Sequence, residues 1–224
     1  MTTKIQLPSQ QQVIYPESDG QPMADNTKQF RWIVTIQGGL DALFQDDANV
    51  FVAGDLLWYP VAGNNTIRKA PDVMVVFGRP KGDRGSYQQW LENNIAPQVV
   101  LEILSPGNRF TEMLNKLRFY ERYGVEECYI YDPEGAQLSG YLRSGEELRE
   151  IEPIAGWVSP RLGVRFELSS EGLELYRPDG QKFATYVELD RQRELAMARA
   201  DQEAQRAERL AAKLQELGID PDML

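Results

Sequence analysis

The sequence has no histidine and only one cysteine, Cys128. The absence of histidine excludes Ser-His-Asp and Cys-His catalysis, histidine metal ligands and imidazole general bases. A single cysteine excludes an internal disulfide and fits a reducing compartment. Any hydrolytic chemistry in this chain must therefore use carboxylates, lysine, hydroxyl groups and a hard metal ion.

Long apolar runs are also absent. No stretch approaches the ~20 apolar residues of a membrane span, and residues 1–9 do not have the apolar core of a signal peptide. We therefore expect a cytoplasmic protein that does not contact a membrane. The length of 224 residues, with 42% hydrophobic and 26% charged residues, is typical of one globular domain with an appendage.

Positive charge is scarce: 24 basic residues stand against 34 acidic ones, which gives a net charge of −10. This balance argues against a protein that coats nucleic acid. The stretch from Arg68 to Arg122 nevertheless has nine basic and six acidic residues, a local charge of +3. Two interpretations remain open for this stretch: its basic residues bind a polyanion locally, or they are scattered charges in contact with solvent.

Hydrophobic spacing predicts an alternation of helices and strands. The predicted helices cover residues 26–45, 86–94, 111–123 and 189–217, and the main predicted strands cover 50–59, 72–77, 98–104, 127–131, 173–176 and 182–186. The runs at 72–77 and 98–104 are apolar on both faces, which is typical of central strands covered on both sides. Residues 98–131 read as a strand–helix–strand crossover.

The first predicted helix has an unusual interior. Its apolar face is expected to consist of Phe30, Ile33, Val34, Leu40, Leu43 and Phe44. Gly38 and Gly39 lie inside it, although each glycine costs a helix about 1 kcal/mol relative to alanine. A close contact between this helix and the sheet would explain the glycine pair.

The C-terminal part of the chain has a narrow apolar seam with spacings of three and four. The seam consists of Met197, Ala200, Ala204, Ala207, Ala211 and Leu214. Such spacing is typical of a coiled coil, and alanine at most seam positions makes it a weak one. We therefore expect a body at 1–187 and a helical tail at 188–224. The tail is interpreted either as a homodimer contact or as a single helix that packs on its own body or frays.

Two carboxylates stand out in the apolar strands. Glu102 lies inside the run Val99–Leu104, where an ionised carboxylate is costly unless a partner compensates it. Asp72 opens the other run, directly after Pro71. If the two strands are neighbours, both carboxylates reach one edge of the sheet and can hold Mg²⁺ or Mn²⁺. The alternative is a carboxylate that caps a strand end or pairs with a buried arginine.

Lys116 is the third candidate. It lies at the margin of the apolar face of the helix that follows the Glu102 strand, between Met113 and Leu117. From there its ammonium group could point back to the carboxylates, which would raise its pKa. The alternative is an exposed i,i+4 pair with Glu112, worth roughly 0.3–0.5 kcal/mol. On that basis, Lys116→Ala is expected to cost little stability.

Several motifs occur in order along the chain. They are Asp19–Met23, Ala70–Val73, Val100–Pro106, Lys116–Tyr120, Tyr129–Pro133, Gly156–Gly163 and Glu216–Pro221. With these motifs the chain resembles the Uma family of bacterial endonucleases, in the PD-(D/E)XK restriction-endonuclease-like superfamily. The resemblance implies an α/β fold with a central mixed β-sheet flanked by α-helices. The hydrophobic pattern adds the long C-terminal helix.

The resemblance also implies a metal-dependent nuclease that acts on DNA. It makes Asp72 the motif aspartate and Glu102 the motif acid, with Mg²⁺ (or Mn²⁺) held by both and by the carbonyl of Ile103. The superfamily has its lysine two residues after the acid, where this chain has Leu104. In the Uma family a lysine on the following helix takes that role, and Lys116 matches it.

Other positions depart from the family or extend the site. Family members often have aspartate where this chain has Glu112, and histidine where it has Gln29. Arg109 and the loop at 79–84 are candidates for phosphate contacts, or for simple solubility. The displaced lysine keeps a second interpretation open, a catalytically weak or inactive DNA-binding or regulatory module. A third is a scaffold that pairs through its tail helix.

Overall fold

The computed structural model describes residues 13–18, 20, 22–107, 110–170 and 172–217. Contacts between residues divide the chain into two compact units, Met1–Phe183 and Ala184–Leu224. The helices are α1 (Thr27–Leu43), the short 3₁₀ helix η1 (Gln89–Leu91), α2 (Phe110–Tyr123) and α3 (Tyr186–Glu216). Within the described ranges, no helix is long and apolar enough to cross a membrane.

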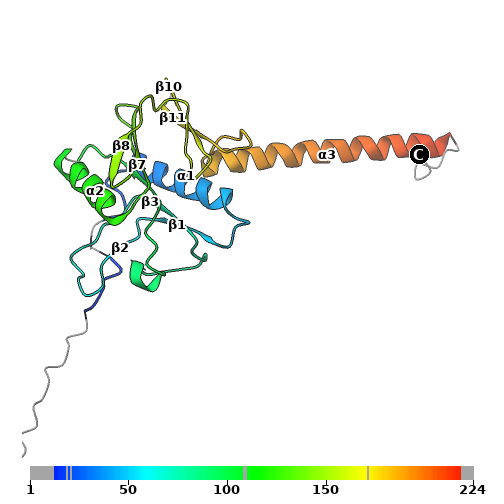
Figure 1. The fold of residues 1–224 in the computed structure, drawn as a ribbon. Helices are drawn as coiled ribbons and strands as arrows, with labels where there is room; N and C mark the ends of the chain where they lie inside the picture. Colours follow the sequence, from blue (N-terminus) through cyan, green and yellow to red (C-terminus); the bar gives the residue numbers. More distant parts are fainter. Residues whose placement is uncertain (1–12, 19, 21, 108–109, 171, 218–224) are drawn as a thin grey trace, which may run out of the picture. The chain divides into compact units, whose positions relative to one another are not determined.

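A mixed six-stranded sheet forms the centre of the first unit (Figure 1). Its strands, in spatial order, are β1 (Val50–Gly54), β3 (Val73–Phe77), β5 (Val99–Ile103), β6 (Glu127–Asp132), β7 (Gln137–Ser144) and β8 (Glu147–Glu150). The β5–β6 pair is parallel and the other neighbours are antiparallel. Parallel strands need a crossover connection, and α2 supplies it, so the predicted strand–helix–strand unit is confirmed.

Two smaller sheets complete the first unit. One consists of the parallel pair β2 (Trp58–Tyr59) and β4 (Tyr87–Gln88), and the other of the antiparallel strands β9 (Trp157–Val158), β10 (Arg165–Ser169) and β11 (Gly172–Tyr176). The central mixed sheet with helices on its faces is the expected fold class.

Three predicted elements were wrong in detail. The strand expected at 50–59 is split into β1 and β2, because Asp55 adopts a left-handed backbone with φ 46°. The helix expected at 86–94 is β4 followed by η1, and Asn93 and Asn94 both have positive φ, which a helix excludes. The strand expected at 182–186 is reduced to a bridge between Tyr176 and Lys182.

The helix α1 covers one face of the central sheet, together with the sheet formed by β9, β10 and β11. The buried residues of α1 are Gln29, Ile33, Ile36 and Leu40. Phe30 and Val34, expected in the core, are instead 47% and 45% exposed. The buried stripe is therefore rotated around the helix, and it brings the polar Gln29 onto the inner face.

The two glycines inside α1, Gly38 and Gly39, differ in their surroundings. A Cβ atom on Gly39 would lie 2.3 Å from the side chain of Phe183, whereas one on Gly38 would meet nothing within 4 Å. The close contact is thus with Phe183 rather than with the central sheet, and only Gly39 requires it.

The helix α2 covers the opposite face of the central sheet. Its buried residue Tyr120 packs in a second core cluster with Met74, Val100 and Cys128. Phe110 is exposed at the first position of the helix. Gly124, with φ 94°, follows the last helical residue and ends the helix.

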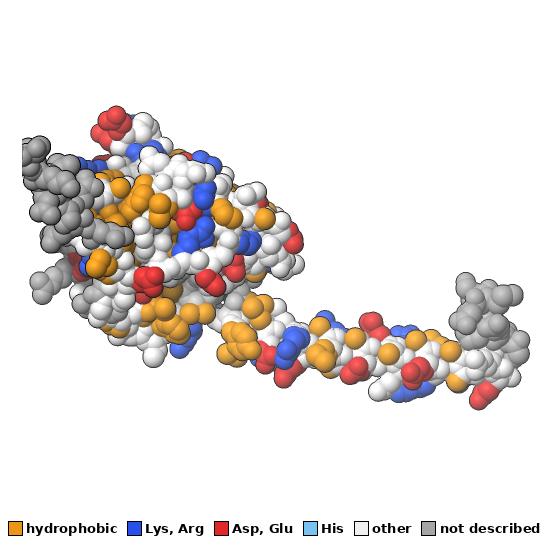
Figure 2. All heavy atoms as spheres, turned by 90° about the horizontal axis from the view of Figure 1, so that it is seen from below, with side chains coloured by type: hydrophobic (Ala, Val, Ile, Leu, Met, Phe, Trp, Pro, Cys, Tyr) orange, Lys and Arg blue, Asp and Glu red, His pale blue; other side chains and the backbone are white. Residues whose placement is uncertain are grey.

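The second unit contains α3. Its first turn is stabilised by a capping box, in which the Thr185 hydroxyl accepts from the Glu188 N–H and the Glu188 carboxylate accepts in return. None of the described residues of α3 is buried. Acidic, basic and hydrophobic side chains alternate along its surface (Figure 2). The long helix predicted for the tail is present, and it begins three residues earlier than expected.

Candidate active site

The pairing of β3 with β5 places the two candidate carboxylates together. Val73 is the cross-strand partner of Leu101, so Asp72, one residue before β3, lies opposite Glu102. Side chains alternate between the faces of a strand, and Met74 and Val100 pack against α2. Asp72 and Glu102 therefore share the α2 face, and the expectation that their strands are neighbours is confirmed.

Glu102 is 1% exposed and is held by two side chains from α2. The Lys116 ammonium donates to its Oε2 at 2.7 Å, and the Tyr120 hydroxyl donates to its Oε1. The compensation that an ionised carboxylate needs in an apolar strand thus comes from a lysine and a tyrosine. The buried arginine considered from the sequence has no part in it.

Lys116 makes its ion pair with Glu102 and not with Glu112. Burial alone lowers the pKa of Lys116, but the nearby carboxylates of Glu102 and Asp72 outweigh it and hold the pKa above its usual value. The expectation that Lys116→Ala costs little stability is therefore wrong, because that substitution would leave a buried carboxylate without its cation.

Asp72 is held by the backbone of the neighbouring strand. Its Oδ2 accepts a hydrogen bond from the N–H of Ile103 at 2.6 Å, and the residue is 8% exposed. Burial and the charge of Glu102 raise the pKa of Asp72 to about 8, although Lys116 acts in the opposite direction. The surroundings of Asp72 therefore favour its protonated form in the chain by itself.

Gln29 reaches the site from α1, on the other face of the sheet. Its side-chain N–H group donates to the carbonyl of Ile103 at 2.8 Å, and its carbonyl accepts from the N–H of Asp25 at 2.8 Å. The position where the family often has histidine is therefore part of the site. The Ile103 carbonyl keeps a second lone pair.

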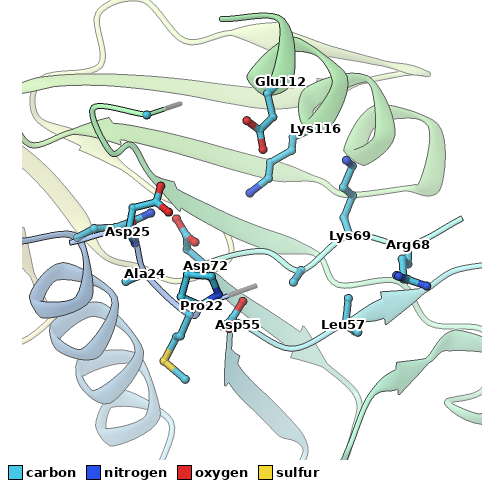
Figure 3. Close-up of a pocket in the computed structure, with 14 residues that line it drawn as sticks. Pro22, Ala24, Asp25, Asp55, Leu57, Arg68, Lys69, Asp72, Glu112 and Lys116 are labelled. Atoms are coloured by element: carbon cyan, nitrogen blue, oxygen red, sulfur yellow. The ribbon is translucent and has the colours of Figure 1, made fainter. Parts of the chain in front are cut away.

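A pocket of about 400 Å³ opens beside Asp72 (Figure 3). Its charged lining residues are Asp25, Asp55, Arg68, Lys69, Asp72, Glu112 and Lys116. The Lys116 ammonium points toward Asp72 from above (Figure 3). Glu102 does not line the pocket, so the three predicted residues form one cluster in which Asp72 and Lys116 face the opening.

The donor set fits a hard cation in part. Two carboxylates and one carbonyl offer only oxygen, which suits Mg²⁺ or Mn²⁺. Burial and the charge of Glu102 raise the pKa of Asp72, and a bound cation would act in the opposite direction. Among the described residues, no group of three or more carboxylate, cysteine or histidine ligands lies in position to hold a metal ion. A cation here would therefore have to keep several waters, as Mg²⁺ usually does.

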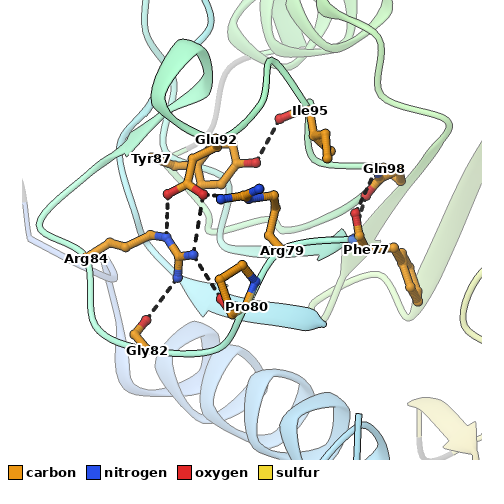
Figure 4. Close-up of polar contacts among 9 residues, drawn as sticks. All are labelled: Phe77, Arg79, Pro80, Gly82, Arg84, Tyr87, Glu92, Ile95 and Gln98. Atoms are coloured by element: carbon orange, nitrogen blue, oxygen red, sulfur yellow. Dashed lines mark hydrogen bonds and ion pairs between the residues drawn. The ribbon is translucent and has the colours of Figure 1, made fainter. Parts of the chain in front are cut away.

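The two arginines of the loop at 79–84, which were candidates for phosphate contacts, form ion pairs within the body (Figure 4). Arg79 and Arg84 both donate to Glu92, at 2.7 Å each, and neither lines the pocket. The Arg84 guanidinium also lies 3.9 Å from the centre of the Phe51 ring. These contacts hold the loop against the body. Arg109 lies outside the described residues.

The sequence analysis missed several residues around the cluster. Tyr120 appeared only as the last residue of the motif Lys116–Tyr120, and no pattern showed that its hydroxyl reaches Glu102. Arg68 and Lys69 could have been suspected from the sequence, because both stand directly before the motif Ala70–Val73. Asp55 could also have been suspected, since it follows a predicted strand and a glycine.

Comparisons with known proteins identify a family and one similar solved structure. The family model Uma2, described as "Putative restriction endonuclease", matches residues 5–176. Among solved structures, "a putative nuclease belonging to DUF820 from Anabaena variabilis ATCC 29413" is similar, with 17% sequence identity and a TM-score of 0.46. The similarity covers 61% of this chain and 74% of that one. A search of curated proteins found no match.

Proposed function

We propose that this chain, which belongs to the Uma2 family, is a divalent-cation-dependent nuclease that hydrolyses phosphodiester bonds of DNA. The observation that carries the proposal is the cluster of Asp72, Glu102 and Lys116 at the edge of the central sheet. An adjacent polar pocket gives a substrate access to two of its members.

Asp72, Glu102 and the carbonyl of Ile103 would hold the Mg²⁺ or Mn²⁺ ion. When bound, such an ion lowers the pKa of a water molecule and neutralises charge on a phosphate. Gln29 fixes the direction of the Ile103 carbonyl through its hydrogen bond. The N–H of the same residue, Ile103, donates to the carboxylate of Asp72 and fixes its position.

Lys116 supplies a fixed positive charge beside the reacting phosphate. Its ammonium is anchored on Glu102 and lines the pocket, so it can orient a water molecule and stabilise negative charge that develops on the phosphate. Tyr120 acts through Glu102, because its hydroxyl occupies the other carboxylate oxygen and fixes the group. Tyr120 is thus a positioning residue.

Cleavage of a supercoiled plasmid tests the proposal. The full chain should convert it to nicked or linear DNA with Mg²⁺ or Mn²⁺ and leave it intact in EDTA. Asp72→Asn and Glu102→Gln should abolish the conversion, whereas Asp41→Asn, at an exposed acid paired with Lys81, should retain it. Cleavage that survives in Asp72→Asn would contradict the proposal.

A second candidate function is a catalytically weak or inactive DNA-binding module. The observation that favours it is that both oxygens of Glu102 are already engaged, by Lys116 and by Tyr120, in a nearly inaccessible position. The same plasmid assay separates the two. The module would shift the mobility of the DNA without cutting it in the presence of either cation.

We further propose that residues 188–224 form a separate helical module through which the chain forms a homodimer. The support is the seam from Met197 to Leu214, on a helix that has no buried residue among those described. A second copy of the chain packed against this seam would remove its apolar surface from water.

We also propose a cytoplasmic location, because a DNA hydrolase needs access to nucleic acid.

A further inference from the structure

Two basic side chains on the pocket wall have no ion-pair partner in the part of the chain that the structure describes. Arg68 and Lys69 both line the pocket and are partly buried. Among the described residues, no carboxylate lies within ion-pair distance of either. Several other basic residues of the body are paired with acids, for example Lys28 with Glu134, Lys81 with Asp41, and Arg161 with Glu126. Unpaired cations in a recess attract an anionic ligand.

The backbone under these two residues is fixed. Trp58 and Lys69 exchange backbone hydrogen bonds in both directions, at 2.8 and 3.2 Å. The Arg68 guanidinium donates to the carbonyl of Asn65 at 2.7 Å. Pro71 restricts the residue before it to extended conformations. Figure 3 shows the Lys69 side chain rising toward α2, beside Lys116. The cations are therefore presented from a rigid wall.

We propose that Arg68 and Lys69 bind backbone phosphates of the nucleic acid within about three nucleotides of the bond that is cut. Asp72 comes three positions after Lys69 in the sequence, so an extended chain places them at most roughly 10 Å apart. One DNA strand advances about 3.4 Å per nucleotide along the helix axis. A phosphate at Asp72 and one at Lys69 can thus belong to the same short stretch of one strand.

The negative net charge of the chain requires local cations such as Arg68 and Lys69 for DNA binding. A net charge of −10 repels a polyanion at long range, so that a nuclease built on this chain has to hold its substrate with local cations. Arg79 and Arg84 are occupied by Glu92 and do not line the pocket. Arg68 and Lys69 remain as the described cations next to the cluster. This inference rests on the proposed function.

The salt dependence of DNA binding tests the proposal. Binding of a short duplex to the full chain is measured in EDTA, which prevents cation-dependent cleavage, between about 50 and 200 mM salt. Removal of one phosphate contact should make the log–log slope less steep by about 0.9. We expect that change for Lys69→Ala and for Arg68→Ala, and restoration of the slope in Lys69→Arg.

Lys81→Ala is the matched control, because it removes the same charge from an exposed pair outside the pocket. Its slope should equal that of the unmodified chain. Equal slopes in all variants, while the unmodified chain cuts plasmid DNA, would contradict phosphate binding by Arg68 and Lys69 but not the proposed nuclease function. A chain that neither binds nor cuts DNA would overturn both. Thermal unfolding of each variant shows that a changed slope does not come from lost structure.

Discussion

At the residue scale, Glu102 and Glu127 show what a buried carboxylate can mean. Both lie in apolar strands and both are almost inaccessible. The carboxylate of Glu127 accepts hydrogen bonds from the hydroxyls of Ser159 and Tyr129 and from the backbone N–H of Arg161. Glu102 is held by a lysine that lines a pocket. Glu102 thus differs from Glu127 in having the ammonium group of a lysine side chain as a partner, which fits the role proposed for it.

That difference limits what the sequence could predict about the site. Asp72, Glu102 and Lys116 were found, because the motif order identified them and the apolar strands made two carboxylates conspicuous. Tyr120 and Gln29 could not be assigned, because their roles depend on the rotation of α2 and α1 against the sheet. A shift of the buried stripe of α1 by one residue decided that Gln29 faces inward.

Lys116→Ala should destabilise the protein by about 3 kcal/mol, because it leaves the Glu102 carboxylate buried without its cation. Urea unfolding measures this. The matched control is Lys81→Ala, whose exposed pair with Asp41 should be worth no more than about 1 kcal/mol. Equal losses in the two variants would show that Lys116 is an ordinary surface lysine. Cleavage should be lost only in Lys116→Ala.

Asp72→Asn should stabilise the protein in EDTA, and increasingly so as the pH rises toward 8. The folded-state pKa of Asp72 is raised to about 8 from 3.8, so the stability that its proton provides is complete below about pH 4 and is lost as the pH rises to 8. Asparagine does not titrate and keeps an acceptor for the Ile103 N–H.

The gap between the two proteins should therefore widen by up to about 1.4 kcal/mol per pH unit. Urea unfolding at several values between about pH 5 and pH 8 measures it, and the titration of other groups cancels in the difference. A gap that is constant across this range would show that Asp72 is ionised throughout.

At the element scale, α2 is attached to β5 through polar groups as well as through its apolar face. Tyr120→Phe removes the hydroxyl that binds Glu102 and should cost about 1.5–3 kcal/mol, as expected for a hydrogen bond to a charged group. Tyr123→Phe is the control on the same helix, since its hydroxyl bonds to none of the described residues. Similar unfolding midpoints for the two variants would remove Tyr120 from the site.

The glycine pair of α1 gives a test of packing. Gly38→Ala should stabilise the protein by up to about 1 kcal/mol, because alanine is the better helix former and nothing lies within 4 Å. Gly39→Ala should destabilise it by about 1–3 kcal/mol, because the new methyl group overlaps the Phe183 ring. Thermal unfolding distinguishes the two, and shifts of the same sign would contradict the contact.

The elements themselves were predicted well where the pattern was strong. The strands β3, β5 and β6 and the helix α2 stand within one or two residues of their expected bounds. Two of the three failures occurred where the backbone conformation of single residues decides, at Asp55 and at Asn93 and Asn94, all of which have positive φ. Hydrophobic periodicity carries no information on that choice.

At the scale of the whole molecule, the dimer proposal concerns α3. If its seam forms a dimer contact, Ala204→Glu should weaken association of the full chain, because it places a charge in the seam. Gln205→Glu changes the neighbouring position off the seam and should have no effect. Sedimentation velocity measures both. A chain that is monomeric before either change would end the dimer proposal.

The central claim is that Asp72 and Glu102 hold one divalent cation, and calorimetric titration of the full chain with Mn²⁺ tests it most directly. We predict one binding event in the unmodified chain and in Asp41→Asn, and its loss in Asp72→Asn and in Glu102→Gln. Cooperative thermal unfolding of each variant ensures that the loss is local. Indistinguishable isotherms for the unmodified chain and Glu102→Gln would contradict the claim.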